Sequence, residues 1–139
     1  MISCGIDLVH IPRFERWTHY TDKQLATLFS VNEIKEFKTK GIRQAAFLAS
    51  RFAAKEACYK ALSNWCALHN QTVPPFHFRT IAPFIELQKN NQWGAPTIKV
   101  NLNGFLGKTG ITLPLLEWSI SVSHEHEYAI AQVLVKTSG

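Results

Sequence analysis

The sequence has no run of about eighteen apolar residues, the length that a membrane-spanning helix needs, and no basic start followed by an apolar stretch. We therefore expect a soluble, cytoplasmic protein without a membrane partner. Hydrophobic residues still make up 46% of the 139 residues, which is enough to bury a sizeable core. This length and composition predict a single domain over residues 1–139.

Cysteine is scarce. Cys4, Cys58 and Cys66 are odd in number and lack CxxC spacing, which argues against both a disulfide framework and a zinc site. The sequence also lacks GxxxxGK[ST] and GxGxxG motifs, so an ordinary nucleotide-binding loop is not expected. His124 and His126 flank an acid but have no further ligand nearby in the sequence, so they are interpreted as turn residues before metal ligands.

Acidic residues are fewer than basic ones. The 15 Lys and Arg against 10 Asp and Glu give a formal net charge of +5, which indicates an anionic partner. The cations are spread along the chain and form no dense basic run, so nucleic acid is not the expected partner.

The residue pattern predicts an α+β fold with the element order β-ααα-ββ-α-ββ. Alternation over residues 1–11 predicts a strand that stops before Pro12, followed by a short helical piece from Arg13. Ser30 and Glu33 have capping-box spacing and open a helix toward residue 40. A long helix without Gly or Pro follows at 42–64. Strands or extended segments are expected at 76–79, 84–89 and 97–101, a turn at 92–96, a short helix at 102–109, and a hairpin of 118–123 with 128–135.

The stretch RFAAKEACYKAL, residues 51–62, places two cations on the apolar side of the long helix. On a wheel of about 100° per residue, Arg51 and Lys55 point into the apolar arc, while Glu56 and Lys60 lie at its polar edge. One interpretation is a solvated helix whose basic stems cover apolar surface, with Glu56 and Lys60 as an i,i+4 pair. The other is that the cations face an anionic ligand in a cleft, where Glu56 faces a cation.

Three polar features stand out from these elements. Asp7 lies in the middle of an apolar strand, Glu56 lies on the long helix, and the SISVSH run ends at His124 with serines 119, 121 and 123 on one strand face. Each alone has a structural interpretation: a turn cap, a partner of Lys60 and a solvated turn residue. Together, two carboxylates, several cations and a histidine suit a diphosphate held by Mg²⁺, which binds carboxylates, water and phosphate oxygens.

Three blocks of the sequence, GIDLVHIPRF, FLASRFAAKEACYKAL and SVSHEHEYAIAQV, resemble the 4′-phosphopantetheinyl transferases of the holo-acyl-carrier-protein synthase type. They occur in that family's order and with similar spacing. The resemblance implies transfer of the phosphopantetheine arm of coenzyme A to a serine of an apo acyl carrier protein, with release of 3′,5′-ADP. It also implies a mostly antiparallel sheet and a homotrimer with active sites at subunit interfaces.

The resemblance further implies roles for the polar residues of the three blocks. Asp7 and Glu56 would bind Mg²⁺ and, with Lys60 and His124, form the catalytic group. Lys55 would join Lys60 and His124 against the coenzyme A phosphates.

Other cations would contact the ends of the two substrates. Arg51 and Arg43 would lie near the adenosine 3′-phosphate, with Lys38 and Lys40 as further candidates for that group. Arg13, with Arg16 nearby, would meet the acidic carrier protein. The serine proton has three possible acceptors: a metal-bound water oriented by Asp7, Glu56 itself, and His124.

Two short segments depart from the family pattern. Ser63, Asn64 and Trp65 stand where a Gly-containing turn is usual, so we expect the pantetheine side of the pocket to be reshaped. Gly94, Ala95 and Pro96 replace a G-K-P turn. Two other functions stay open: a Mg²⁺-dependent phosphoesterase that uses water in place of serine, and a non-catalytic module that binds coenzyme A or an acidic protein.

Overall fold

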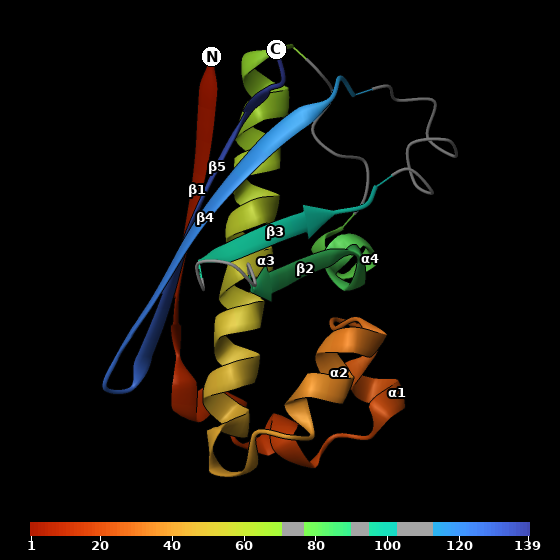
Figure 1. The fold of residues 1–139 in the computed structure, drawn as a ribbon, viewed down its shortest axis with the longest axis vertical. Coiled ribbons are helices and arrows are strands. Elements are labelled where there is room, and N and C mark those ends of the chain that lie inside the picture. The colour runs from red at the N-terminus through yellow and green to blue at the C-terminus, as the bar shows by residue number, and fades with distance from the viewer. Residues whose placement is uncertain (71–76, 90–94, 103–112) are drawn as a thin grey trace.

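A computed structural model describes residues 1–70, 77–89, 95–102 and 113–139. Its centre is the long helix α3 (Gln44–Leu68), which lies against a three-stranded sheet on one side and a two-stranded hairpin on another (Figure 1). The larger sheet has the order β1-β5-β4, and both of its pairings are antiparallel. The smaller sheet pairs β2 with β3, also antiparallel. The strands are β1 (Ile2–His10), β2 (Ile85–Lys89), β3 (Pro96–Val100), β4 (Leu116–Glu125) and β5 (Tyr128–Thr137).

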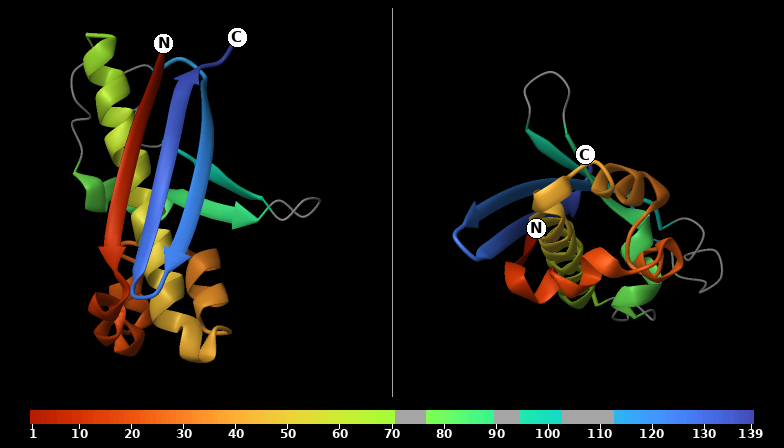
Figure 2. Two further views of the ribbon diagram at one scale, coloured as in Figure 1. Left: turned by 90° about the vertical axis from the view of Figure 1, so that its left-hand side faces the viewer. Right: turned by 90° about the horizontal axis from the view of Figure 1, so that it is seen from below.

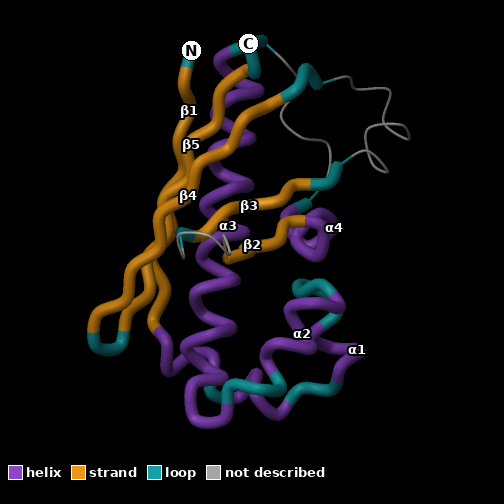
Figure 3. Tube along the Cα trace, in the orientation of Figure 1, coloured by secondary structure: helices purple, strands orange, loops and turns teal. Residues whose placement is uncertain are grey.

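Short helices gather around the N-terminal half of α3 and beside the smaller sheet (Figures 1 and 3). They connect β1 to α3 and lead into β2. Within the described residues, no helix is both long enough and apolar enough to cross a bilayer. The short helices are η1 (Ile11–Phe14), η2 (Arg16–His19), α1 (Asp22–Leu25), α2 (Val31–Phe37), η3 (Gly41–Arg43), α4 (Phe78–Ile81) and η4 (Ala82–Phe84).

Local sequence signals predicted several elements correctly. The α+β class with antiparallel pairing is confirmed, as is a first strand that ends just before Pro12. The capping box is present, because Ser30 Oγ accepts from the Glu33 amide at 3.2 Å and the Glu33 carboxylate accepts from the Ser30 amide at 3.0 Å. The C-terminal hairpin is also confirmed, with His126 in its turn at a φ of 51°.

Other predictions were wrong. Residues 78–81 form the helix α4 rather than a strand, and α1 was not predicted at all. The helix that begins at Val31 ends at Phe37, and α3 continues to Leu68 rather than ending near Asn64. The turn at 92–96 and the helix at 102–109 fall mostly on residues outside those described.

Residues 63–65 continue α3 where the family pattern has a Gly-containing turn, and the reshaping of the pantetheine side of the pocket stays a prediction. Ser63 Oγ donates to the Tyr59 carbonyl at 2.9 Å, within the helix. Asn64 Nδ2 donates to the Cys4 carbonyl of β1 at 2.8 Å, so the extended helix remains tied to the sheet. Trp65 is buried and stacks on His69, with ring centroids 4.0 Å apart.

The larger sheet has one covered face and one outer face. Gly5, Val9 and Val133 lie on the face toward α3 and are buried. Figure 2 (left) shows β1, β5 and β4 side by side in front of the helix, with the other face of the sheet turned outward. We call the exposed apolar side chains on that side the outer face: Ile2, Ile6, Leu8, Tyr128 and Leu134. Ser119, Ser121 and Ser123 are exposed together on one face of β4, as predicted.

Candidate active site

Asp7 lies in the middle of β1 and points toward α3. It is paired with Ala131 of β5, so it does not cap a turn. Its side chain is 14% exposed, and its Oδ1 accepts a hydrogen bond from Lys60 Nζ at 3.0 Å. Among the described residues, Asp7 Oδ2 is buried without a hydrogen-bond partner. A buried, unpartnered carboxylate oxygen is costly, so this atom needs a cation or a donor that the described residues do not supply.

Glu56 lies beside Asp7 on the facing side of α3. Burial raises the pKa of Glu56, and the charge of Asp7 raises it further, while Lys60 and Arg13 act in the opposite direction. The two carboxylates are therefore near enough to repel each other. Lys60 Nζ donates to Asp7 and to the Ile6 carbonyl, each at 3.0 Å, so the strand rather than Glu56 fixes its position. We call Asp7, Glu56 and Lys60 the carboxylate site.

The donor atoms of the carboxylate site fit a magnesium ion. Mg²⁺ is bound by one or two carboxylates and fills its other positions with water and phosphate oxygens. Asp7 and Glu56 supply two carboxylates, one with an orphaned buried oxygen. In the part of the chain that the structure describes, no third His, Cys, Asp or Glu completes a metal cluster with them. A cation held there needs further ligands from water or from a bound phosphate.

Gly5 is a site residue that sequence reasoning missed. A Cβ atom at this position would lie 2.1 Å from the Ala57 carbonyl oxygen and 2.5 Å from the Ala61 nitrogen, both in the backbone of α3. Only glycine permits this close approach of strand to helix. The approach brings Asp7, two residues later, against Glu56 and Lys60. A glycine inside a strand pattern was the available signal.

We expect Gly5→Ala to separate β1 from α3. Because the added methyl group meets backbone atoms rather than a movable side chain, the variant should lose about 1–3 kcal/mol of unfolding free energy. Urea unfolding measures this loss. Cys4→Ala is the matched control, because its side chain is exposed on the same strand. Equal stability of the two variants would show that strand and helix can move apart freely.

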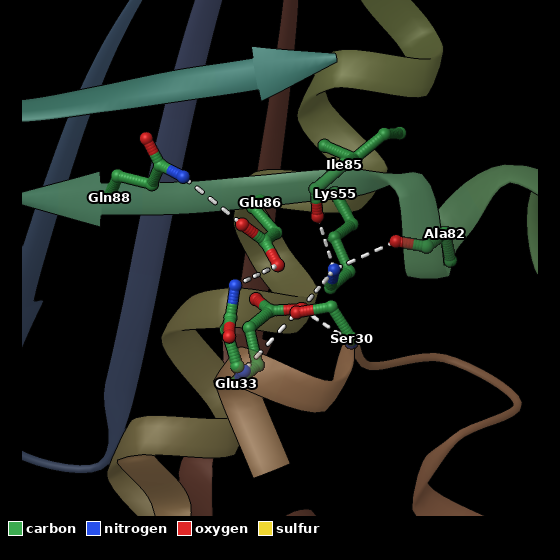
Figure 4. A network of polar contacts seen from close by, with 8 residues as sticks. Ser30, Glu33, Lys55, Ala82, Ile85, Glu86 and Gln88 are labelled. Carbon is green, nitrogen blue, oxygen red and sulfur yellow. Dashed lines mark hydrogen bonds and ion pairs between the residues drawn. The ribbon is translucent and has the colours of Figure 1, made fainter. Parts of the chain in front are cut away.

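Lys55 points into the protein interior. Its side chain is 1% exposed, and Nζ donates to Glu33 Oε1 at 2.6 Å, to the Ala82 carbonyl at 2.8 Å and to the Ile85 carbonyl (Figure 4). The prediction that Lys55 contacts coenzyme A phosphates is therefore wrong. A helical wheel gives the direction in which a side chain points. It does not show that an acid of another element, here Glu33 of α2, lies there and binds the lysine.

Arg51 lies on the same side of α3 as Lys55. Its side chain is 11% exposed, its guanidinium lies 4.2 Å from the centroid of the Phe47 ring, and its Nη2 is 3.7 Å from Glu36 Oε1. The acids of α2, Glu33 and Glu36, thus meet the two cations of the apolar arc. The structure does not bring Arg51 together with Asp7. Its contact with a 3′-phosphate stays a prediction.

The other predicted residues lie at the border of the carboxylate site or away from it. Arg13 is exposed near the site, with its guanidinium 5.1 Å from the centroid of the Phe52 ring, and its charge acts on Glu56. Arg16 is exposed on η2. Arg43 directly precedes the first residue of α3 and lies roughly 20 Å along the helix from Glu56 at about 1.5 Å per residue.

His124 lies at the exposed end of the β4–β5 hairpin. His124 of β4 is paired with Ala129 of β5, and Asp7 of β1 is paired with Ala131 on the other side of β5. The strands that carry His124 and Asp7 are therefore two strand spacings apart, each of about 4.8 Å. His124 lines a groove of about 440 Å³ with Leu8, Tyr128 and Ile130. Within one chain, the structure does not join His124 to the carboxylate site.

Comparisons with known proteins agree with this arrangement. A profile of the 4′-phosphopantetheinyl transferase superfamily matches residues 3–133. Proteins named holo-[acyl-carrier-protein] synthase from Treponema pallidum (strain Nichols) and Borreliella burgdorferi are 37% and 32% identical to this chain over 138 residues. Both alignments cover 98% of this chain, together with 96% and 99% of the respective relatives.

Solved structures show the same fold. The Chronobacterium ammoniagenes ACPS–CoA complex has a TM-score of 0.76 at 26% identity and covers 100% of this chain and 99% of that chain. The Helicobacter pylori holo-[acyl-carrier-protein] synthase in complex with coenzyme A has a TM-score of 0.64 at 31% identity, covering 98% of this chain and 100% of that chain. The resemblance of the three sequence blocks is thereby confirmed, and the chain belongs to the 4′-phosphopantetheinyl transferase superfamily.

Proposed function

We propose that this protein transfers the 4′-phosphopantetheine group of coenzyme A to a serine of an apo acyl carrier protein and releases 3′,5′-ADP. The whole chain, residues 1–139, acts as one transferase domain in the cytoplasm. Relatives named holo-[acyl-carrier-protein] synthase and solved complexes with coenzyme A support the reaction and its first substrate. The observation that carries the proposal is the carboxylate site, in which two carboxylates and a lysine face one another between β1 and α3.

The site residues account for binding and orienting the diphosphate. The carrier serine hydroxyl loses its proton to a base and its oxygen forms a bond to the β-phosphorus of coenzyme A. The bond from that phosphorus to the bridging oxygen breaks, and 3′,5′-ADP leaves with that oxygen and the electron pair. Asp7 and Glu56 would hold Mg²⁺, which when bound would offset negative charge on the diphosphate. The Lys60 side chain is 49% exposed, so its ammonium can reach a phosphate oxygen while it remains beside Asp7. Two carboxylates alone would repel the diphosphate, and Lys60 counters that repulsion.

A mass spectrum of an apo acyl carrier protein tests the reaction class. After incubation with this protein, coenzyme A and Mg²⁺, the carrier should gain the mass of one phosphopantetheine group and 3′,5′-ADP should appear. Breakdown of coenzyme A without a change in carrier mass would instead indicate a phosphoesterase. Binding of coenzyme A with no chemical change would indicate a non-catalytic module.

We expect Arg16 and Arg13 to affect the carrier protein differently. Both are exposed cations that can attract an acidic partner, so Arg16→Glu should raise the KM for the carrier several-fold and leave the KM for coenzyme A little changed. Arg13→Glu should also lower kcat, because the charge of Arg13 acts on Glu56. Steady-state kinetics at low and high salt measures both effects, and the Arg16 effect should shrink with salt. Equal changes in both KM values for Arg16→Glu would contradict a carrier contact there.

The outer face supports assembly into a homotrimer with active sites between subunits. Its side chains include Ile2, Ile6 and Leu8, which are 63%, 53% and 61% exposed on a single strand. Contiguous exposed apolar side chains of this kind mark interaction surfaces. The groove that His124 lines adjoins this face at Leu8 and Tyr128, so a neighbouring subunit that covers the face would lie beside His124.

Placing a charge on the outer face should prevent assembly. Ile6→Lys is expected to shift the protein from trimer to monomer and to reduce activity, because an unpaired charge would be buried in the contact. Sedimentation velocity measures the shift. Val31→Lys is the matched control, because Val31 is 80% exposed on α2, away from the sheet. A fully active wild-type monomer would contradict an interfacial active site.

A further inference from the structure

Lys55 joins three separate segments of the chain in the protein interior. Its ammonium group donates to Glu33 in α2, to the Ala82 carbonyl in η4 and to the Ile85 carbonyl at the start of β2 (Figure 4). Lys55 and Glu33 are 1% and 4% exposed as side chains. The contacts span 22 to 30 residues of sequence, so they hold α3 against elements that precede and follow it.

The buried Lys55–Glu33 ion pair is expected to add little to the free energy of unfolding. Burial lowers the pKa of Lys55 and raises the pKa of Glu33, against the attraction between the two groups. Glu33 Oε2 is also buried without a hydrogen-bond partner among the described residues. Replacing such a pair by uncharged side chains is often neutral or stabilising, so its presence calls for another role. A buried charge pair can fix the register of two packed elements, because any slip leaves both charges unpaired.

The position of Lys55 on α3 links this pair to the carboxylate site. Glu56 is the next residue, so the rotation of the helix that points Lys55 at Glu33 also determines where Glu56 points. Lys60 projects about 140° around the helix from Lys55 and bonds Asp7 on β1. The helix is thus held by one lysine on each of two sides, and Glu56 lies on the side of Lys60.

We propose that Lys55, through its buried pair with Glu33, is a positioning residue that fixes the rotation of α3 and thereby sets the affinity of Asp7 and Glu56 for a divalent cation. The inference rests on the proposed function of those two carboxylates as metal ligands. Lys55 itself touches neither metal nor substrate. It acts only through the direction in which α3 presents Glu56.

The test measures how tightly Mn²⁺ binds to the double variant Lys55→Met with Glu33→Gln. Electron paramagnetic resonance detects the free Mn²⁺ during the titration. The variant removes both charges, and the side-chain amide oxygen that Glu33→Gln introduces can still accept from the Ser30 amide, so α2 keeps its cap. We expect the melting temperature to fall, because the buried Ala82 and Ile85 carbonyls lose their donor. The affinity for Mn²⁺ should fall by about tenfold or more, as for other residues that orient metal ligands. The rise in melting temperature with Mg²⁺ and coenzyme A should shrink in parallel.

Two controls separate positioning from general effects. Lys136→Met with Glu117→Gln removes an exposed pair of the same charges at 3.3 Å and should leave Mn²⁺ affinity unchanged. Leu25→Ala removes buried apolar volume from α1 and lowers stability while keeping both members of the Lys55–Glu33 pair. If Leu25→Ala weakens Mn²⁺ binding as much as the double variant does, the effect is one of stability and the proposal is overturned.

A milder variant keeps the test decisive if the double variant does not fold. Glu33→Gln alone leaves Lys55 bonded to two carbonyls and should weaken Mn²⁺ binding by a smaller factor. Wild-type affinity in a folded Glu33→Gln or double variant would overturn the positioning role while leaving the proposed function intact. If Asp7→Asn binds Mn²⁺ as tightly as the wild type, the proposed metal site fails instead.

Discussion

Asp7→Asn and Glu56→Gln should each lower turnover by about a hundredfold or more, and the double variant should be little worse than either single variant. The two carboxylates face each other between β1 and α3. Under the proposed function they act on the same diphosphate, so the loss of either disables the unit. Initial rates over a range of Mg²⁺ concentrations measure the effect. Independent contributions would instead appear as rate losses that multiply in the double variant.

The same variants should not destabilise the protein without metal. Asp7 raises the pKa of Glu56, so neutralising one carboxylate relieves repulsion at the site. The Asp7→Asn side chain also keeps an oxygen that can accept from Lys60, whose side chain is 49% exposed, so the ion pair that is lost adds little stability. Thermal unfolding without metal should show an unchanged or higher melting temperature, and the rise caused by Mg²⁺ with coenzyme A should shrink in both variants. A large loss of stability without metal would indicate that Asp7 and Glu56 stabilise the fold rather than bind a metal.

Strong local signals carried most of the fold prediction. Alternation predicted β1, and the Ser30–Glu33 spacing predicted the start of α2. The segments that failed are short. A four-residue helix such as α4 shows too little periodicity to be distinguished from a strand, and tertiary packing decides its conformation. The length of α3 was underestimated because Asn64 and Trp65 find partners only in the folded protein, in the Cys4 carbonyl and in His69.

The part of the candidate site that lies between β1 and α3 could be predicted from the sequence. Asp7 was recognised as a charge in an apolar strand, and its proximity to Glu56 and Lys60 followed the family resemblance. Lys55 was misassigned because its acid partner is 22 residues away in sequence, on a helix whose packing no periodicity reveals. Gly5 was overlooked because its importance lies in an atom it lacks, and only the distance to the α3 backbone shows this.

Mixing two inactive variants should restore activity if each site is shared between subunits. Arg43 lies roughly 20 Å along α3 from Glu56, so within one chain it is far from the carboxylate site. We therefore expect Arg43 of one subunit to bind the 3′-phosphate of a coenzyme A molecule held mainly by its neighbour. Asp7→Asn and Arg43→Ala proteins, unfolded together and refolded as a mixture, should then form some sites in which both residues are intact.

The amount of restored activity follows from the geometry of a cyclic assembly. Each intact site needs Asp7 from one chain type and Arg43 from the other, so random mixing in equal amounts makes about a quarter of the sites intact. The refolded mixture should approach that fraction of wild-type turnover, while each variant refolded alone should remain inactive. A mixture of Asp7→Asn with Glu56→Gln is the matched control. These residues lie together within one chain, so no arrangement of subunits restores a complete pair. Recovery in that control, or none in the Arg43 mixture, would show that the site is not divided between subunits in this way.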